Sequence, residues 1–295
     1  MEAQRLLDRI DAGQVGTFPA RLEWFERVAS TNDVVAAWLR AGTPEVCVAI
    51  ADEQSAGRGR GGRTWMAPPG AALLLSVGFR PMWLAPEHAW RLGAIVSLAM
   101  AGAADEIAGV PPGTVRLKWP NDLVVVAGRD RLAPGDDEAL PVRKLGGVLG
   151  ETDGLGTPDP RAVVGIGINA GWAREDFPGE LAASMTSLAD LAPRGPTAAA
   201  IHREALVDAF LARLGPLADH LRSRGEFPAE AWQARQLTNG LPVRLEWPDG
   251  SIETVIAVDV DAESGALLVR PMGSTSPARP VLVGEIRHLR FGGVV

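Results

Sequence analysis

Seven consecutive residues, Gly57 to Arg63, consist of four glycines and three arginines. Glycine lets the backbone adopt conformations and approach ligands in ways that other residues avoid. Arginine presents a planar fork of donors that matches carboxylate and phosphate oxygens. Trp65 and the pair Pro68-Pro69 follow, and they limit how far this segment can move. The sequence therefore predicts a loop between two strands that closes on an anionic ligand.

The same segment also fits two other interpretations. Runs of glycine and arginine occur in solvated, disordered loops and in arms that bind RNA. The whole chain has 29 basic and 36 acidic residues and a formal charge of -7, whereas a nucleic-acid-binding protein usually has a basic surface. The charge therefore favours a small anionic ligand over RNA.

A dinucleotide site is a further alternative, because Gly57, Gly59 and Gly62 satisfy the pattern G-x-G-x-x-G. In that motif a strand comes before the glycines and a helix begins from them. Here Pro68-Pro69-Gly70 and an apolar strand follow, so the dinucleotide interpretation fails. The chain contains no G-x-x-x-x-G-K-[ST] sequence, which excludes a P-loop.

The chain has 295 residues, of which 46% are hydrophobic, enough for one or two domains with a packed core. Residues 1–11 mix charges with leucines and lack the apolar segment of a secretion signal. The longest uncharged helical stretch, residues 92–104, is shorter than the ~20 residues that span a bilayer. These features predict a cytoplasmic protein.

Cys47 is the only cysteine and lies in an apolar run from Val46 to Ile50, which is typical of a small buried side chain on a strand. A disulfide within the chain is therefore excluded. The four histidines, at positions 88, 202, 220 and 288, do not have the spacing of a metal site. Any metal ion is expected to arrive with a nucleotide.

Strands and helices alternate over the first 237 residues. Apolar residues with a period of two indicate strands, and apolar spacing of three and four indicates helices. Helices are expected at residues 3–11, 31–41, 86–108, 197–222 and 228–236, and strands at 22–29, 46–52, 71–79, 115–126, 144–151 and 162–169. Turn-forming residues predict an insertion at 128–140 and an irregular segment at 171–196.

From Leu241 onward, short strands alternate with turn residues. Strands are expected at 243–247, 252–260, 267–271 and 281–289. This pattern is typical of a small β-barrel and places a boundary near residue 238, which divides the chain into domains at 1–237 and 238–295. The region from Leu241 has five arginines, no lysine and seven carboxylates, so it is expected to dock or complete a site rather than bind RNA.

Pro120 interrupts the strand expected at 115–126, where proline cannot donate a hydrogen bond to the ladder. A bend at this point would turn Lys118, Asn121 and Asp122 toward a ligand. An amide and a carboxylate suit a polyphosphate that carries Mg²⁺. The alternative is a surface turn that ends the strand.

Lys144 precedes Gly146-Gly147 in an apolar strand, and these glycines would leave bare backbone for a flat ligand. A lysine beside that gap would neutralise a carboxylate and then the charge that develops at a phosphorus atom. The alternative is a lysine in an exposed turn. The run from Gly165 to Asn169 repeats the alternation and ends in an amide that could bind a base edge, although glycines in strands also mark bulges.

Taken in order, five motifs resemble those of the biotin-protein ligases over about residues 20 to 290. They are Ser30-Thr31-Asn32, Gln54 with Gly57-Arg58-Gly59-Arg60-x-Gly62-Arg63-x-Trp65, Lys118-Trp119-Pro120-Asn121-Asp122, Lys144-Leu145-Gly146-Gly147-Val148-Leu149 and Gly165-Ile166-Gly167-Ile168-Asn169. The resemblance implies an α+β fold, in which a mixed β-sheet backed by helices, related to class II tRNA synthetases and lipoate ligases, is followed by a small SH3-like β-barrel. It also implies the monofunctional type, because only about 20 residues precede the pattern, where bifunctional members carry a DNA-binding domain.

The resemblance implies a reaction in two steps. Biotin attacks the α-phosphate of ATP, bound with Mg²⁺, to give biotinyl-5′-AMP and pyrophosphate, and a lysine of a biotin carboxyl carrier domain then takes the acyl group. Lys144 and Arg60 are the implied catalytic residues. The implied biotin-binding residues are Ser30, Thr31, Asn32, Gln54, Gly57, Arg58, Arg60, Lys144 and Gly147. The implied ATP-binding residues are Arg58, Arg60, Arg63, Trp65, Lys118, Asn121, Asp122 and Asn169, of which Asn121 and Asp122 would also hold Mg²⁺.

This mechanism needs no nucleophile from the chain, because biotin supplies the attacking oxygen and the carrier supplies the amine. The protein would contribute positioning and charge stabilisation. The loop at 57–65 is expected to order over the adenylate and to protect it from water.

The implied macromolecular partner is the carrier domain; neither DNA nor a membrane is expected as a partner, and a homodimer is compatible with the sequence. A lipoate or octanoate ligase on the same fold is one alternative, but its ligand lacks the ureido group that Ser30, Thr31 and Gln54 would bind. An RNA-binding module built on the glycine and arginine loop is the other alternative.

Overall fold

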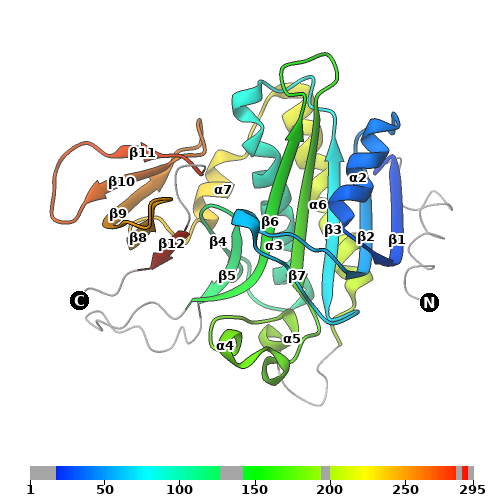
Figure 1. Ribbon diagram of the computed structural model, residues 1–295, viewed down its shortest axis with the longest axis horizontal. Helices are drawn as coiled ribbons and strands as arrows, with labels where there is room; N and C mark the ends of the chain where they lie inside the picture. Colours follow the sequence, from blue (N-terminus) through cyan, green and yellow to red (C-terminus); the bar gives the residue numbers. More distant parts are fainter. Residues whose placement is uncertain (1–17, 127–141, 194–199, 284–287, 292–295) are drawn as a thin grey trace.

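The computed structural model describes residues 18–126, 142–193, 200–283 and 288–291. Within them, a seven-stranded mixed sheet backed by helices is followed by a five-stranded antiparallel sheet (Figure 1). The predicted fold class, a mixed sheet with helices and a second small β unit, is confirmed. The helix expected at residues 3–11 and the insertion expected at 128–140 lie outside the described residues.

The seven strands of the large sheet lie in the order β1-β2-β3-β7-β6-β5-β4. Strands β1 and β2 are parallel, and every other neighbouring pair in this sheet is antiparallel. Their bounds are Arg21–Val28 (β1), Cys47–Gln54 (β2), Ala72–Phe79 (β3), Arg116–Lys118 (β4), Asp122–Val126 (β5), Val142–Asp153 (β6) and Arg161–Asn169 (β7). The strand expected at 115–126 is thus two strands that form a hairpin around Pro120.

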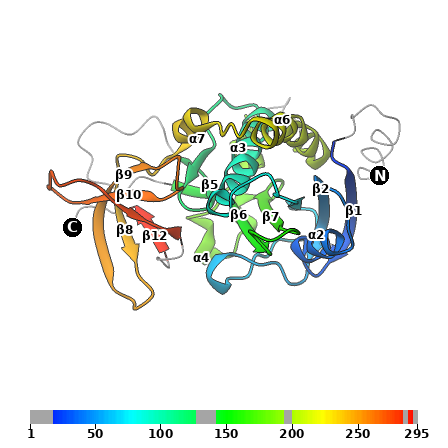
Figure 2. The same cartoon turned by 90° about the horizontal axis from the view of Figure 1, so that it is seen from above.

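Helices cover the large sheet on both faces (Figure 2). On one face, α3 (Trp90–Ile107) packs against α6 (Arg203–Arg224) and against the sheet, and on the other α2 (Thr31–Arg40) packs against β2, β3 and β7. All eight residues of β3 are buried, because this central strand is covered from both sides. None of the described helices combines the length and apolar character that a membrane span needs.

The residues of β2 alternate between these two layers, as expected for a strand. Val48 and Ile50 belong to the core that includes α3 and α6, whereas Cys47 and Ala49 pack with residues of α2. Cys47 is fully buried, as predicted, and this burial raises the pKa of its thiol to about 11.

The remaining helices of the described residues are short. They are η1 (Arg60–Gly62), η2 (Pro86–His88), η4 (Arg174–Asp176), α4 (Gly179–Ala182), α5 (Leu188–Leu191) and α7 (Ala229–Arg235). The segment expected to be irregular at 171–196 therefore contains three short helices, which the turn-forming residues of the sequence concealed. The helix expected at 86–108 divides into η2 and α3.

The small sheet has the strand order β11-β10-β9-β8-β12 and is antiparallel throughout. Its strands are β8 (Pro242–Glu246), β9 (Ile252–Val260), β10 (Leu267–Pro271), β11 (Arg279–Val281) and β12 (His288–Phe291). The single strand expected at 281–289 was wrong, because β11 and β12 lie at opposite edges of this sheet. The boundary at residue 238 stays a prediction; α7 ends before it and β8 begins after it.

Trp119, next to the bend at Pro120, connects the two sheets. Its backbone N–H donates to Thr238 Oγ1 at 3.0 Å, and its indole Nε1 donates to the carbonyl oxygen of Gly265 at 3.0 Å. Gly265 in turn lies against Trp90 of α3, with φ at +72°. The small sheet therefore packs against both the bend and the helical layer.

We predict that Gly265→Ala lowers the free energy of unfolding by about 2–4 kcal/mol. A Cβ atom there would lie 2.7 Å from Trp90 Cδ2, and overpacking of this kind costs about 1–3 kcal/mol beyond the cost of about 1 kcal/mol for a positive φ. Gly273→Ala is the matched control, since its φ is +70° and no atom lies within 4 Å of the new Cβ position. Equal losses for the two variants in urea unfolding would contradict the predicted packing against Trp90.

Candidate active site

A cavity of about 560 Å³ lies between α2, the segment 57–65, strands β5 to β7 and strand β12. The segment 57–65 is called the flap below. Of the site residues expected from the sequence, those that line the cavity are Ser30, Thr31, Asn32, Gln54, Arg58, Arg60, Arg63, Trp65, Lys118, Asn121, Asp122, Lys144 and Gly147. Gly57 and Asn169 do not line it.

One end of the cavity has a polar floor, which consists of Thr31, Asn32 and Gln54, with the buried Ser76 beneath it. The Gln54 side-chain oxygen accepts hydrogen bonds from the backbone N–H of Thr31 at 2.7 Å and from the Thr31 hydroxyl at 3.0 Å. Its amide N–H₂ remains as a donor for a ligand. The floor thus places an amide donor beside a hydroxyl group.

Ser76 supplies the hydrogen bonds beneath this floor. Its hydroxyl oxygen lies 2.6 Å from Asn32 Oδ1 and 2.7 Å from Thr31 Oγ1. The single Thr31 proton is donated to Gln54, so the single Ser76 proton serves the two acceptors next to it, Asn32 Oδ1 and Thr31 Oγ1. Thr31 retains a lone pair that can accept an N–H of a ligand. Ser76 was not predicted as a site residue, although it is a lone hydroxyl within the apolar run of β3.

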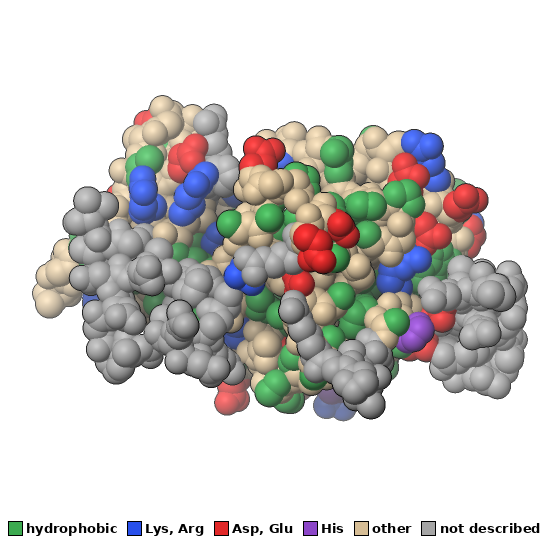
Figure 3. Space-filling view, turned by 90° about the horizontal axis from the view of Figure 1, so that it is seen from below, with side chains coloured by type: hydrophobic (Ala, Val, Ile, Leu, Met, Phe, Trp, Pro, Cys, Tyr) green, Lys and Arg blue, Asp and Glu red, His purple; other side chains and the backbone are tan. Residues whose placement is uncertain are grey.

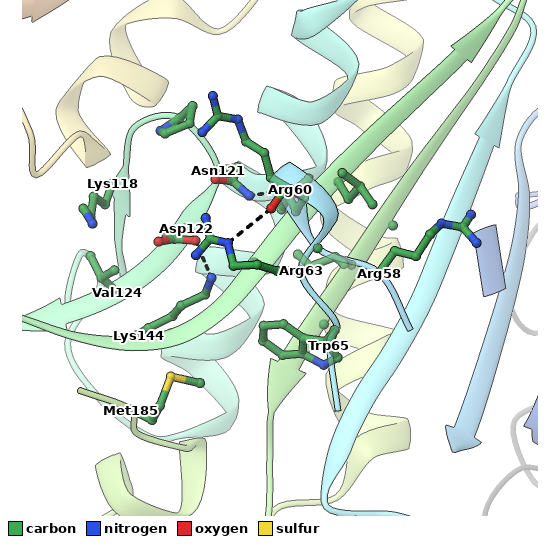
Figure 4. A pocket seen from close by; sticks show the side chains of 18 of the residues that line it. Arg58, Arg60, Arg63, Trp65, Lys118, Asn121, Asp122, Val124, Lys144 and Met185 are labelled. Atoms are coloured by element: carbon green, nitrogen blue, oxygen red, sulfur yellow. Dashed lines mark hydrogen bonds and ion pairs between the residues drawn. The ribbon is translucent and has the colours of Figure 1, made fainter. Parts of the chain in front are cut away.

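Cationic side chains gather at the other end of the cavity. They are Lys118, Arg63 and Lys144, which lie around Asp122 (Figure 4), and Arg60, whose guanidinium donates to the carbonyl oxygen of Val283. Lys144 Nζ lies 2.6 Å from Asp122 Oδ1. Burial lowers the pKa of Lys118, and the nearby Lys144 contributes in the same direction. Burial also lowers the pKa of Arg60, with a further contribution from Arg63. An anionic ligand placed here would relieve the repulsion among these groups.

The two lysines of the cluster are the only lysines in the chain, and all the other basic residues are arginines. Both lysines line this one cavity. The positions of the two lysines are therefore a sequence signal for this site in addition to the motifs.

Lys144 is held by a segment that the sequence predicted as irregular. Its backbone N–H donates to Ser184 O at 2.8 Å, and its carbonyl accepts from Thr186 N at 3.0 Å. Asn169 is buried behind this segment and donates from Nδ2 to Thr186 O at 3.0 Å. Asn169 thus supports the backbone beside Lys144 rather than lining the cavity.

Strands β6 and β7 present bare backbone to the flap. In β7, Ile166 and Ile168 point into the core that contains α3, so Gly165 and Gly167 face the other way. A Cβ atom at Gly167 would lie 2.7 Å from the Trp65 ring, and one at Gly147 would lie 3.6 Å from it. The indole of Trp65 therefore covers the area that the sequence predicted for a flat ligand, and its Nε1 is buried without a partner among the described residues.

Arg58 points away from the cationic cluster (Figure 4). Its guanidinium pairs with Asp33 at 2.8 Å and with Glu151 at 3.1 Å. This differs from the expectation that Arg58 would bind the ligand anion. Hydrogen bonds with these carboxylates raise the pKa of Arg58, and its hydrogen bond lowers the pKa of Asp33.

Other residues of the cavity could not be found from motifs. Leu289, Arg290 and Phe291 come from β12 of the small sheet. The Lys118 ammonium lies 5.5 Å from the centre of the Phe291 ring. The small sheet therefore contributes side chains to the cavity.

Asn121 and Gly57 have structural contacts in this arrangement. Asn121 lines the cavity and donates from Nδ2 to Val148 O at 2.9 Å, so its side-chain oxygen is not used in that hydrogen bond. The carbonyl of Gly57 accepts from Trp65 N at 2.9 Å and closes the base of the flap.

Comparison with known proteins shows consistent similarity. The model of the biotin/lipoate A/B protein ligase family matches residues 24–169. The biotin--[acetyl-CoA-carboxylase] ligase of Mycobacterium tuberculosis is 33% identical over 272 residues, which are 92% of this chain and 90% of that protein. The enzyme of the same name from Paracoccus denitrificans is 30% identical, over 88% of this chain and 98% of that protein.

A solved structure has the same fold. The biotin protein ligase from Aquifex aeolicus in complex with biotin and ATP aligns with a TM-score of 0.69 and 24% identity. The alignment covers 92% of this chain and 99% of that one. Both sheets therefore belong to one known architecture.

The lowered pKa of Lys118 predicts a pH dependence for anion binding at the cationic cluster. In the folded chain Lys118 loses its proton at a pH below the ordinary pKa of lysine. As pH rises through the lowered pKa, the free energy of unfolding therefore increases, because the unfolded chain still binds this proton. Over the same range the Lys118 side chain loses its charge and its attraction for an anion. Affinity for inorganic pyrophosphate, measured by calorimetry, should fall over that range. Lys118→Arg stays charged and should lack this step; an identical pH profile in the variant would assign the titration to another group.

Proposed function

Because this chain belongs to the biotin protein ligases of the biotin/lipoate A/B protein ligase family, we propose that it activates biotin with ATP and transfers the biotinyl group to a lysine of a biotin carboxyl carrier domain. The family resemblance found in the motifs is confirmed. The observation that carries the proposal is one cavity with a polar floor at one end and a cationic cluster at the other.

The floor suits the ureido ring of biotin. A cyclic urea offers N–H donors and a carbonyl acceptor, and the floor offers the Thr31 oxygen as an acceptor and the Gln54 amide as a donor. Ser30 lies at the start of α2 beside them and also lines the cavity. A lipoyl or octanoyl chain has no polar group to pair with this floor, so binding it would leave these groups without partners.

The cationic cluster suits the biotin carboxylate and the α-phosphate of ATP. In the first step a carboxylate oxygen forms a bond to the α-phosphorus, and the bond to pyrophosphate breaks. Lys144 and Arg60 would stabilise the negative charge in this transition state, while Lys118 and Arg63 would bind the phosphates that leave. Reaction would require Lys144 to exchange part of its contact with Asp122 for the ligand.

The adenine ring is assigned to the surface next to Trp65, which lies over the bare backbone of Gly147 and Gly167. A flat base and a flat indole can both pack on strands without side chains. Asn169 would act indirectly. It binds the backbone of Thr186, and Thr186 binds the backbone of Lys144.

Mg²⁺ is expected to arrive with ATP. The Asp122 carboxylate and the Asn121 side-chain oxygen are donors of the type that Mg²⁺ prefers, and nucleotide phosphates and water would complete its shell. Among the described residues no group of three histidine, cysteine or acidic side chains could hold a metal without a ligand. The ion would neutralise phosphate charge.

In the second step the carrier lysine attacks the carbonyl carbon of biotinyl-5′-AMP. An amide bond forms, the bond between the carbonyl carbon and the AMP oxygen breaks, and the lysine ammonium loses two of its three protons, so that the amide keeps one N–H. The chain would contribute by holding the adenylate and excluding water beneath the flap. The small sheet, which supplies Arg290 and Phe291 to the cavity, would be near the incoming carrier domain.

An RNA-binding role for the flap has little support. The face seen from below shows basic and acidic side chains in separate small groups and no continuous basic area among the described residues (Figure 3). Two of the three flap arginines, Arg60 and Arg63, line the cavity, and the guanidinium of the third is paired with carboxylates.

The proposal is tested by pyrophosphate release from the purified protein. Release should require both ATP and biotin, and lipoate or octanoate should not replace biotin. A purified carrier domain should then become biotinylated on a lysine, as detected by mass spectrometry. Release that proceeds without biotin, or equally well with lipoate, would overturn the proposed substrate.

Lys144→Ala should retain the fold and lower the single-turnover rate of adenylate formation about 100-fold or more, because the developing charge loses its nearest cation. Arg143→Ala is the matched control. Arg143 is the preceding residue on β6, carries the same charge and does not line the cavity. A Lys144→Ala rate close to that of the control would remove Lys144 from its proposed role.

A further inference from the structure

The flap is joined to the body of the protein through Arg58. Arg58 Nη1 and Nη2 donate to the two oxygens of Asp33, at 3.0 Å and 2.8 Å. Nε and Nη2 also donate to the two oxygens of Glu151, at 3.2 Å and 3.1 Å. One guanidinium on the flap thus binds two carboxylates, one on α2 and one on β6, in the paired geometry that makes such contacts specific.

Glu151 also binds the floor of the cavity. The amide of Asn32 donates from Nδ2 to Glu151 Oε2 at 2.7 Å, and Asn32 Oδ1 lies 2.6 Å from the Ser76 hydroxyl. Ser76 contacts Thr31, which belongs to the floor itself. A continuous series of hydrogen bonds therefore runs from Thr31 through Ser76 and Asn32 to Glu151, and from there to the flap.

Glu151 lies outside the cavity in which the reacting groups would bind. Neither Glu151 nor Asp33 lines the cavity, whereas Arg60, Arg63 and Lys144 do. Figure 4 shows Arg58 on the opposite side of the flap from Lys144 and Asp122. The flap itself is a narrow loop, in which Gly59 N donates to Arg63 O at 2.6 Å and Trp65 N donates to Gly57 O at 2.9 Å. Fixing Arg58 therefore also fixes Arg60, Arg63 and Trp65 over the cavity.

We propose that Glu151 is a positioning residue that keeps the flap closed over the cavity and links closure to the floor on which the ureido ring would lie, with Arg58 as its counterpart and Asp33 as a second anchor. This inference rests on the proposed function, because the molecule retained under the flap would be biotinyl-5′-AMP. Arg58 lines the cavity, and in this arrangement its guanidinium is held by carboxylates of the protein. The expected effect of Glu151 is on escape of the adenylate rather than on its formation.

The test uses the full chain, biotin and ATP. Adenylate is formed in one turnover without carrier, and its release is followed by trapping the free acyl adenylate with hydroxylamine. Glu151→Gln keeps a carbonyl oxygen for Asn32 but loses the charge that faces Arg58, so release should become about fivefold faster while formation changes less than about twofold. Asp33→Asn tests the second anchor and should act in the same direction.

Asp153→Asn is the matched control. Asp153 lies two residues further along β6, is also paired with an arginine, Arg161 at 3.1 Å, and does not line the cavity. Its substitution should leave release unchanged.

The ion pairs of Arg58 are partly exposed, so salt should weaken them. Release of the adenylate from the unsubstituted protein should therefore accelerate between about 0.05 M and about 0.5 M salt. This acceleration should be smaller in Glu151→Gln.

A double substitution separates the two possible roles of Arg58. If Arg58 acts through Glu151, then Arg58→Gln combined with Glu151→Gln should release adenylate no faster than Arg58→Gln alone. Additive effects, or a loss of adenylate formation in Arg58→Gln alone, would mean that Arg58 contacts the ligand and would overturn the inference. Unchanged release in both Glu151→Gln and Asp33→Asn would also overturn it. Failure of the unsubstituted protein to form adenylate would instead reject the proposed function.

Discussion

The cavity depends on one constraint, which is the absence of side chains at Gly147, Gly165 and Gly167 in the middle of β6 and β7. Gly147 and Gly167 are opposite each other in this strand pair, so the bare area extends across both strands. The other face of β7 carries the isoleucines that pack against the helical layer. Since strand residues alternate between faces, the same short sequence supplies both the core and the cavity wall. With larger side chains at the glycine positions, the flap and its indole could not lie this close to the sheet.

The second sheet completes the same cavity from the opposite side. The bend that places Lys118 and Asp122 is held through Trp119, whose donors bind Thr238 and Gly265. Strand β12 then adds Arg290 and Phe291 to the wall. The cavity therefore lies between the large sheet and the small sheet, and the flap contacts both, since Arg60 donates to the carbonyl of Val283, two residues after β11. Binding sites often occur at such junctions between units.

The sequence predicted two kinds of site residue. One kind lies next to a recognisable helix start, and the other lies in a strand whose residues alternate between two faces. Ser30 to Asn32 begin a helix, and the glycines of β6 and β7 alternate with apolar residues, so their positions follow from local patterns. The partners of Arg58 could not be predicted in this way, because Asp33 and Glu151 lie 25 and 93 residues from it in the sequence. The same applies to β12, since only the observed sheet order shows that it forms the edge next to Lys118. Contacts of this kind are set by tertiary packing, which no motif encodes.

The placement of the two lysines has a chemical consequence for an enzyme that makes a mixed anhydride. Such an intermediate acylates primary amines, whereas a guanidinium group stays protonated and is a poor acyl acceptor. The chain carries its basic charge almost entirely as arginine, and its two lysines line the cavity, one of them in contact with Asp122. An activated acyl group that diffuses away therefore meets no lysine on the exterior of the protein that made it. The small number of lysines therefore limits acylation of the protein by its own adenylate, in addition to any retention of the adenylate by the flap.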